Sequence, residues 1–277
     1  PPRSTHCISS AASDVYKRQE LNDTQSEPDD RGIDINWVGV NSFKFPIVFQ
    51  DKSEERSTIA DFQLSVDLAN NHRGTHMSRF IEVLNDQCEI ISVKNLSNLN
   101  NCLVDKLEST NSKISIDFPY FINKNAPETN SKGIVDYGVN LVSTLENGSY
   151  ELMSTVSVPV TTLCPCSKAI SDRGAHNQRG CVKFSVVASS TIWLEDMIAL
   201  VESSASSELY SVLKRPDEKL VTERAYDNPV FVEDLVRNVA IKANQLDSII
   251  WYKIEAENFE SIHNHNAYAV VINNRKN

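Results

Sequence analysis

Residues 32–68 read GIDINWVGVNSFKFPIVFQDKSEERSTIADFQLSVDL and carry the clearest strand pattern in the chain. Apolar and polar side chains alternate from Ile33 to Phe49 and again from Ile59 to Val66, and this period of two residues is typical of a strand with one buried face. The charged segment Asp51–Arg56 separates the two runs and suits a hairpin turn. We therefore predict two antiparallel strands, over residues 32–50 and 58–68.

The elements predicted after this hairpin come in a similar order in both halves of the chain. In the first half, apolar residues of Thr75–Leu84 share one helical face. The remaining patterns predict a helix over 99–107 and strands over 113–121 and 133–145, then strands over 150–163 and 182–188, helices over 192–202 and 230–245, and strands over 249–257 and 267–272.

This order predicts an α+β fold with two tandem modules, residues 21–132 and 133–277, each an antiparallel sheet with helices on one face. The second face and the edges of such sheets also need a partner, which a barrel or a neighbouring subunit would provide. We therefore expect the chain to oligomerise. Residues 1–20 lack any apolar pattern, and we interpret them as a non-native or disordered head.

Composition limits the classes of partner. The 277 residues are 40% hydrophobic and 23% charged, as in ordinary globular proteins. The 27 Lys and Arg against 37 Asp and Glu give a net charge of −10, which argues against nucleic acid or an anionic membrane surface as a partner. No apolar stretch is long enough for a membrane span. Six cysteines are too few for a secreted disulfide scaffold, so we expect a reducing, cytoplasmic compartment.

The polar segment 161–179 holds two thiols, Cys164 and Cys166, and the imidazole of His176 directly after a predicted strand. A cysteine is a ligand or nucleophile as a thiolate, and nearby cations such as Lys168 would favour that form. The spacing is not that of a zinc finger, and a catalytic site with three protein ligands fits it better. Two half-buried free cysteines near a loop histidine are the alternative.

Three further polar segments could contribute to the same chemistry. His263 and His265 would face the same side if their strand continued, and could bind a metal or move protons, although a polar hairpin turn explains them equally well. The carboxylates of residues 215–234 read mostly as solvated charges at helix ends. Arg73 and Arg79 flank a glycine and a helix start that could hold phosphate, or that simply form a capped helix.

Four separated motifs, taken together, resemble GTP cyclohydrolase IB. The motifs are LCPCSK (163–168) with GAHNQR (174–179), RGTHMSRF (73–80), AYDNP (225–229) with FVED (231–234), and ESIHNH (260–265). The resemblance implies a tunnelling fold, a homotetramer with active sites at subunit interfaces, and conversion of GTP and water to 7,8-dihydroneopterin triphosphate and formate. This reaction is the entry to folate-type pterin synthesis.

The resemblance also implies a role for each matching residue. The implied metal ligands are Cys164, His176, Glu218 and His263. The implied catalytic groups are Cys164, Cys166 and His265, with the division of roles between the two thiols left open. The implied substrate contacts are Glu233 to guanine, and Arg73, Arg79, Lys168 and Arg179 to the triphosphate. The metal would be manganese or zinc, or iron. Arg73 stands where lysine is equally expected, and the segment Asn264-His265-Asn266 includes an asparagine where aspartate is common.

The expected mechanism is attack of a metal-activated water on C8 of guanine, with His265 and Cys166 moving protons. Two alternatives from other classes stay open at this point. One is a tunnelling-fold reductase that uses NADPH and a cysteine nucleophile on a nitrile. The other is a non-catalytic oligomer in which the metal is structural. Within the cyclohydrolase reaction itself, a cyclic phosphate instead of the triphosphate is a further possible product.

Overall fold

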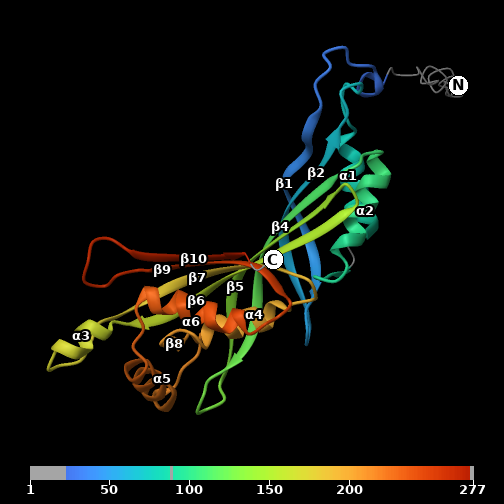
Figure 1. The fold of residues 1–277 in the computed structure, drawn as a ribbon. Helices are drawn as coiled ribbons and strands as arrows, with labels where there is room; N and C mark the ends of the chain where they lie inside the picture. Colours follow the sequence, from blue (N-terminus) through green and yellow to red (C-terminus); the bar gives the residue numbers. More distant parts are fainter. Residues whose placement is uncertain (1–22, 88–89, 275–277) are drawn as a thin grey trace, which may run out of the picture.

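The structure is a computed structural model that describes residues 23–87 and 90–274. The predicted head at residues 1–20 lies outside the described residues. Figure 1 shows one long, curved sheet with helices laid along it, and the two ends of the sheet point in different directions. None of the helices in the described residues has the length and apolar character needed to cross a bilayer.

Within the described residues, ten strands form one sheet in the order β10-β9-β7-β6-β5-β4-β2-β1-β3, and β8 pairs with β6. All of these pairs are antiparallel except the short parallel pair β1 and β3. The strands are β1 (Ile35–Gln50), β2 (Glu55–Leu68), β3 (Ile90–Ile91), β4 (Ser112–Asn125), β5 (Lys132–Glu146), β6 (Ser149–Leu163), β7 (Asn177–Ala188), β8 (Ser207–Glu208), β9 (Ile249–Asn258) and β10 (Ala267–Asn274). The predicted hairpin is the β1–β2 pair, so that prediction is confirmed.

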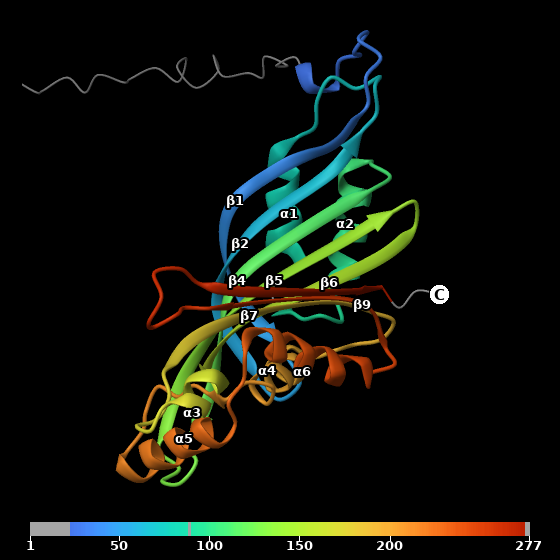
Figure 2. The ribbon, with the colours of Figure 1, turned by 60° about the vertical axis from the view of Figure 1, so that its left-hand side comes forward.

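The helices cover one face of the sheet, with α1 and α2 on the first half and α4 and α6 on the second (Figures 1 and 2). Phe62, Ile116, Leu141, Val186 and Tyr252 belong to one row of paired residues across the strands, and all five are buried. The same face is therefore buried in both halves. The helices are α1 (Met77–Gln87), α2 (Leu96–Leu107), α3 (Pro165–Ile170), α4 (Leu194–Glu202), α5 (Arg215–Asp227) and α6 (Val232–Asn244), and Thr24–Ser26 form a short 3-10 helix.

The opposite face of the sheet is mixed, with polar rows beside an apolar row that includes Val142, Met153 and Val187. Asp61, Asp117, Asn140, Thr155 and Ser185 form a row of direct cross-strand neighbours there. The face that packs on helices is largely apolar and buried, and this buried face is the one that the alternation along the strands predicts. The α+β prediction is confirmed. The sheet runs without a break through the β4–β5 pair, and the division into modules at residues 132/133 stays a prediction.

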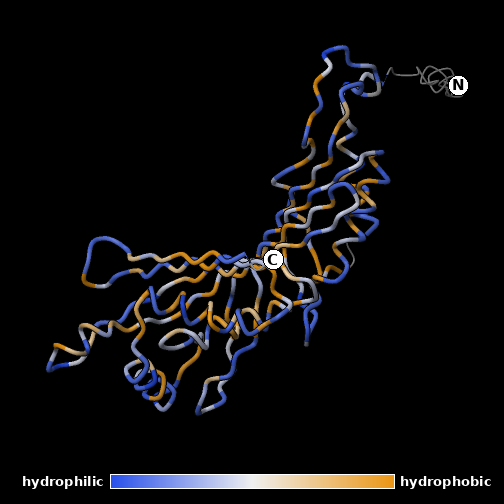
Figure 3. The backbone as a smooth tube through the Cα atoms, in the orientation of Figure 1, coloured by the Kyte–Doolittle hydropathy of each residue, from blue (hydrophilic) through white to orange (hydrophobic). Residues whose placement is uncertain are grey.

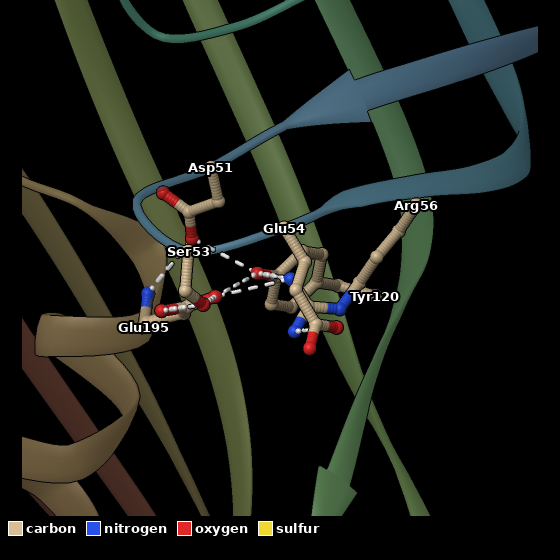
Figure 4. A network of polar contacts seen from close by, with 6 residues as sticks. All are labelled: Asp51, Ser53, Glu54, Arg56, Tyr120 and Glu195. Atoms are coloured by element: carbon tan, nitrogen blue, oxygen red, sulfur yellow. Dashed lines mark hydrogen bonds and ion pairs between the residues drawn. The ribbon is translucent and has the colours of Figure 1, made fainter.

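A polar network joins the turn between β1 and β2 to the start of α4 (Figure 4). The buried Asp51 accepts hydrogen bonds through Oδ2 from the Tyr120 hydroxyl (3.0 Å) and from the backbone N–H of Glu195 (3.0 Å). Arg56 donates to the Tyr120 hydroxyl (2.7 Å) and to Glu195 Oε1 (3.0 Å). Burial raises the pKa of Asp51 above its ordinary value. This network fastens the first half of the chain to the second.

Helix α5 is the main element that the periodicity did not predict. Only Asp217 and Ala225 are buried along its length, so it carries no apolar stripe. Figure 3 shows it as a largely hydrophilic segment at the tip of the second half. Helix α2 also begins earlier than predicted, at Leu96, because the buried side chains of Leu96 and Leu99 extend the helical face.

Candidate functional site

The carboxyl end of β6 is a junction of several chain segments. The N–H of Leu163 donates to Ser206 Oγ (3.0 Å), and the carbonyl of Leu163 accepts from Val230 N (3.0 Å). The N–H of Cys164 donates to the carbonyl of His176 (3.1 Å). The end of β6 is thereby tied to the start of β7, the segment before β8 and the segment before α6.

The two thiols of the predicted site lie at the start of α3. Cys164 precedes the helix, and its Sγ accepts a hydrogen bond from Ser167 N at 3.4 Å. Pro165 fits the first helical position, where its missing N–H costs nothing. Cys164 is half-buried and Cys166 is exposed. The two thiols therefore differ in environment, with Cys164 held against the backbone and Cys166 open to solvent.

His176 lies beside Cys164 and is held by its Nδ1 atom. Nδ1 is 3.0 Å from Gln178 Oε1 and 3.3 Å from Ser261 Oγ. Gln178 in turn donates through Nε2 to Thr162 Oγ1 (2.9 Å). Among the described residues, the Nε2 atom of His176 has no hydrogen-bond partner. The ring is oriented by one nitrogen, which leaves the other available to a ligand.

The loop between β9 and β10 approaches this histidine from another element. Its start is fixed by the hydrogen bond from Phe259 N to Arg179 O (2.9 Å). The rings of His263 and His265 stack at 5.1 Å between centroids and 19° between planes. Strand β9 ends at Asn258, so the two imidazoles come together within a loop and not through continued strand alternation. Both are exposed.

The two predicted carboxylates lie in the first turns of α5 and α6. Glu218 is exposed and pairs with Arg215 at 3.2 Å. Glu233 is exposed, and its helix follows Val230, the residue bonded to the end of β6. Glu233 is therefore carried by α6, which follows a segment bonded to the end of β6, and Glu218 by α5, which contacts β6.

Asp217, beside Glu218, is fully buried and anchors α5. It accepts hydrogen bonds from Glu128 N (2.9 Å), Thr129 N (2.9 Å), Thr129 Oγ1 (2.6 Å) and Lys214 N (2.9 Å). Burial alone would raise its pKa, but these hydrogen bonds outweigh burial and hold the pKa below the ordinary value. The turn between β4 and β5 therefore fixes the start of α5.

A second polar cluster holds α5 from the side of the sheet. Lys124 Nζ lies between Glu202 Oε1 (2.7 Å) and Glu208 Oε2 (2.9 Å). Glu208 also pairs with Arg224 of α5 at 3.1 Å. Burial raises the pKa of Glu202. Burial also opposes ionisation of Glu208, but bonds from Tyr210 and Lys124 prevail and lower its pKa.

The four predicted phosphate contacts fall in two places. Lys168 of α3 donates to the carbonyl of Tyr226 and lies 4.3 Å from the centroid of its ring. Arg179 is an exposed residue of β7. Arg73 instead pairs with Glu27, and Arg79 of α1 is 3.8 Å from Glu108.

Helix α1 lies on the first half of the sheet, far from helices α3 and α5 in the second half (Figure 2). A single chain therefore does not bring Arg79 to the thiols. Within residues 23–87 and 90–274, no three His, Cys, Asp or Glu side chains lie close enough together to hold a metal. The structure places Cys164 beside His176, and the assignment of the four ligands stays a prediction.

Sequence reasoning gave no role to Gln178, Thr162, Ser261 or Asp217. Gln178 lies in β7, which begins at Asn177, whereas the predicted strand covers only 182–188, so alternation was not applied to His176 and Gln178. The signal for Asp217 was weak: it follows Pro216 near a helix start, and nothing local shows that the distant Thr129 completes its hydrogen bonds.

The donor atoms of the predicted set fit a divalent transition metal. A thiol, two imidazoles and a carboxylate form a mixed S/N/O set that suits zinc or manganese. His176 keeps a free Nε2 in the described structure, and Glu218 is engaged only by the exposed Arg215. The residues therefore fit such an ion in their chemistry.

Comparison with known proteins gives a consistent result. A family model described as type I GTP cyclohydrolase folE2 matches residues 21–269. A GTP cyclohydrolase FolE2 of Akkermansia muciniphila is 54% identical over 257 residues, covering 91% of this chain and 97% of that protein. One of Magnetococcus marinus is 49% identical over 252 residues, covering 91% of this chain and 95% of that protein.

Among solved structures, the uricase of Arthrobacter globiformis is similar to this chain with a TM-score of 0.51 at 8% identity, covering 87% of this chain and 94% of the uricase. At this identity the likeness shows the fold alone. It supports the tunnelling fold that the sequence motifs implied.

Proposed function

This chain belongs to the type I GTP cyclohydrolase FolE2 family, and on that basis we propose that it converts GTP and water to 7,8-dihydroneopterin triphosphate and formate. The proposed site is the junction at the end of β6, formed by α3, the start of β7, the β9–β10 loop and the first turns of α5 and α6. The observation that carries this placement is the contact between Cys164 and His176, which joins two separate parts of the family's motif set.

Cys164, His176, Glu218 and His263 would hold a divalent ion, manganese or zinc, with iron as a further candidate. Such an ion lowers the pKa of a bound water to ~7 and polarises carbonyl oxygens, which is the chemistry that opening the imidazole ring of guanine at C8 requires. The half-buried Cys164 is the better candidate for a permanent ligand. The exposed Cys166 is free to contact substrate.

His265 and Cys166 would move protons to and from the ring nitrogens and during the rearrangement of the sugar. An imidazole suits this role because its ordinary pKa, ~6.5, lies close to neutral pH. His265 stacks on His263, so a ligand role for one ring would fix the position of the other. This gives the proton carrier a defined place in an otherwise exposed loop.

Glu233 would accept hydrogen bonds from the N–H groups of the guanine edge, which a carboxylate can do through both oxygens. Lys168 and Arg179 would contact the triphosphate from the same chain. Arg73 and Arg79 lie with the first half of the sheet, far from α3, so they would have to come from a neighbouring subunit. We therefore include a homotetramer with interfacial sites in the proposal, and we retain the cytoplasmic location expected from the cysteine content.

The test is incubation of the manganese-loaded and the zinc-loaded full chain with GTP, following formate release and the fluorescence of the oxidised pterin product. We expect formate and pterin to form together in equal amounts. Oxidation of NADPH with a nitrile substrate, and no formate, would instead indicate the reductase. Failure of both reactions, with subunits dissociating on chelation, would indicate a structural metal. Digestion of the product with phosphatase distinguishes a linear triphosphate from a cyclic phosphate.

A further inference from the structure

Two buried side chains support His176: Gln178 contacts the imidazole, and Thr162 contacts Gln178. They are direct cross-strand partners in the last part of the β6–β7 ladder. Thr162 is fully buried and Gln178 is 8% exposed. A buried amide needs its polar atoms satisfied, and here one side of the amide meets Thr162 and the other meets His176.

The direction of these bonds fixes where the imidazole carries its proton. Gln178 Nε2 donates to Thr162 Oγ1 (2.9 Å), so Oε1 is the atom that faces His176 Nδ1 (3.0 Å). An amide oxygen carries no hydrogen, and the hydrogen between the two atoms must therefore belong to Nδ1. Neutral His176 is then the Nδ1–H tautomer, with a lone pair on Nε2.

We infer that Gln178, held by Thr162, is a positioning residue that selects the tautomer of His176 and aims its Nε2 at the metal. The inference rests on the proposed ligand role of His176. A metal-bound histidine usually donates its other ring N–H to an oxygen of the protein, and loss of such a partner typically lowers metal affinity by about 10–100-fold. Gln178 supplies an uncharged oxygen for this purpose.

Ser261 extends the same arrangement to the β9–β10 loop. Its Oγ is 3.3 Å from His176 Nδ1, so the atom that Gln178 holds is also in contact with the loop that carries His263. The orientation of one proposed ligand is thereby linked to the position of another. The link depends on Nδ1 facing away from the metal, which is the orientation that Gln178 stabilises.

The variants that test this are Gln178→Met, which keeps the length of the side chain but removes the acceptor, and Thr162→Val, which removes the partner of the amide. Thr162→Ser keeps the hydroxyl and serves as the conservative rescue. Thr155→Val is the matched control, because Thr155 is another threonine of β6 whose hydroxyl donates to a neighbouring strand, at Ser185 (2.8 Å), outside the site. Thermal unfolding shows whether each variant is folded.

The first measurement is nitrogen NMR of ¹⁵N-histidine in the metal-free full chain at about pH 8, well above the ordinary histidine pKa of ~6.5. His176→Asn identifies the signals of His176 among those of the six histidines. We expect the Nδ1–H tautomer in the unmodified chain and in Thr162→Ser. In Gln178→Met we expect a shift towards the Nε2–H tautomer. An Nε2–H tautomer in the unmodified chain would overturn the inference.

The second measurement is the affinity for zinc, by competition with a chromophoric chelator. We expect Gln178→Met to bind zinc about 10–100-fold more weakly, Thr162→Val to lie between it and the unmodified chain, and Thr155→Val to be unchanged. Unchanged affinity in a folded Gln178→Met, while Cys164→Ala loses zinc, would contradict the positioning role alone. If Gln178→Met and Cys164→Ala both kept the zinc affinity of the unmodified chain, the metal site of the proposed function would be contradicted. The NMR measurement would still report the tautomer of His176.

Discussion

At the level of single residues, the sequence predicts the roles of Cys164 and His176 but not the contact between them. The motif puts both residues in one polar segment, and the chemistry of thiol and imidazole suggests a common ligand role. Their contact, however, depends on the register of β6 against β7, with Leu163 opposite Asn177. Gln178 lies before the predicted strand over 182–188, so its place beside His176 was not predicted. Its partner Thr162 was not predicted either, because that pairing depends on the same register.

Glu233 is the residue on which substrate recognition should depend most. In Glu233→Gln the carboxylate becomes an amide that can accept through one oxygen only, and we expect the KM for GTP to rise about 10–100-fold, in line with roughly 1.5–3 kcal/mol for hydrogen bonds to a charged group. Metal content should be unchanged.

Asp234→Asn is the matched control for Glu233→Gln, since Asp234 is the next residue of α6 and pairs with Arg237 at 3.4 Å. It should keep the KM of the unmodified chain. Steady-state kinetics and metal analysis measure both effects. An unchanged KM in Glu233→Gln, or an equal rise in both variants, would count against the guanine contact.

At the scale of the element, α5 could not be predicted from periodicity because it has no apolar stripe. Its place is set by polar contacts from distant parts of the chain, namely Thr129 to Asp217 and Glu208 to Arg224. Helices α1, α2, α4 and α6 and the eight longer strands, in contrast, carry their own pattern and were predicted from it, although β7 begins at Asn177, five residues before its predicted start. Polar anchoring of this kind depends on tertiary structure, and local sequence does not reveal it.

Thr129→Val tests the anchoring of α5. The change leaves Asp217 buried with one hydrogen bond fewer, so we expect a lower midpoint of thermal unfolding and a weaker affinity for zinc, because Glu218 follows Asp217 directly. Thr58→Val is the control, since Thr58 donates to the carbonyl of Pro119 (2.9 Å) in the other half of the sheet. Equal metal affinities in the two variants would contradict a link between the anchor and the ligand.

The pH dependence of stability gives a second test of this anchor. The pKa of Asp217 lies below its ordinary value of 3.8, so the folded state binds this proton less readily than the unfolded state. Its stabilising effect is therefore present above pH ~4 and is lost as the pH falls further toward the folded pKa.

In thermal unfolding from pH 6 to pH 3, the difference in midpoint between the unmodified chain and Asp217→Asn should shrink as the pH falls. Asp86→Asn, at an exposed position of α1, measures the general effect of removing one carboxylate. A difference for Asp217→Asn that stays constant or grows on acidification would contradict the assignment.

At the scale of the whole molecule, the decisive feature is the separation of the proposed phosphate contacts. Helix α1 packs on the first half of the sheet, and helices α3 and α5 lie in the second half, beyond the carboxyl end of β6 (Figure 2). The net charge of −10 describes the chain as a whole, whereas Arg73, Arg79, Lys168 and Arg179 are concentrated in the motifs. A second subunit is the means by which both groups could reach one triphosphate.

Mixed oligomers test this arrangement. We expect the double variant Arg73→Ala with Arg79→Ala to be inactive, and Cys164→Ala to be inactive. When the two chains are co-expressed with different tags and purified together, random mixing leaves about one site in four with all its groups intact, so about a quarter of the activity should return. Mixed oligomers that remain inactive would contradict a site shared between subunits.

The fate of the guanine C8 atom reports most directly whether this chain opens the imidazole ring of GTP. The manganese-loaded full chain is incubated with [8-¹³C]GTP and followed by ¹³C NMR, alongside Cys164→Ala and the control Cys102→Ala, whose thiol lies on α2 outside the site. We expect one equivalent of ¹³C-formate per GTP consumed by the unmodified chain and by Cys102→Ala, and none from Cys164→Ala. Formate release by Cys164→Ala at the unmodified rate, or none by the metal-loaded unmodified chain, would contradict the proposed function.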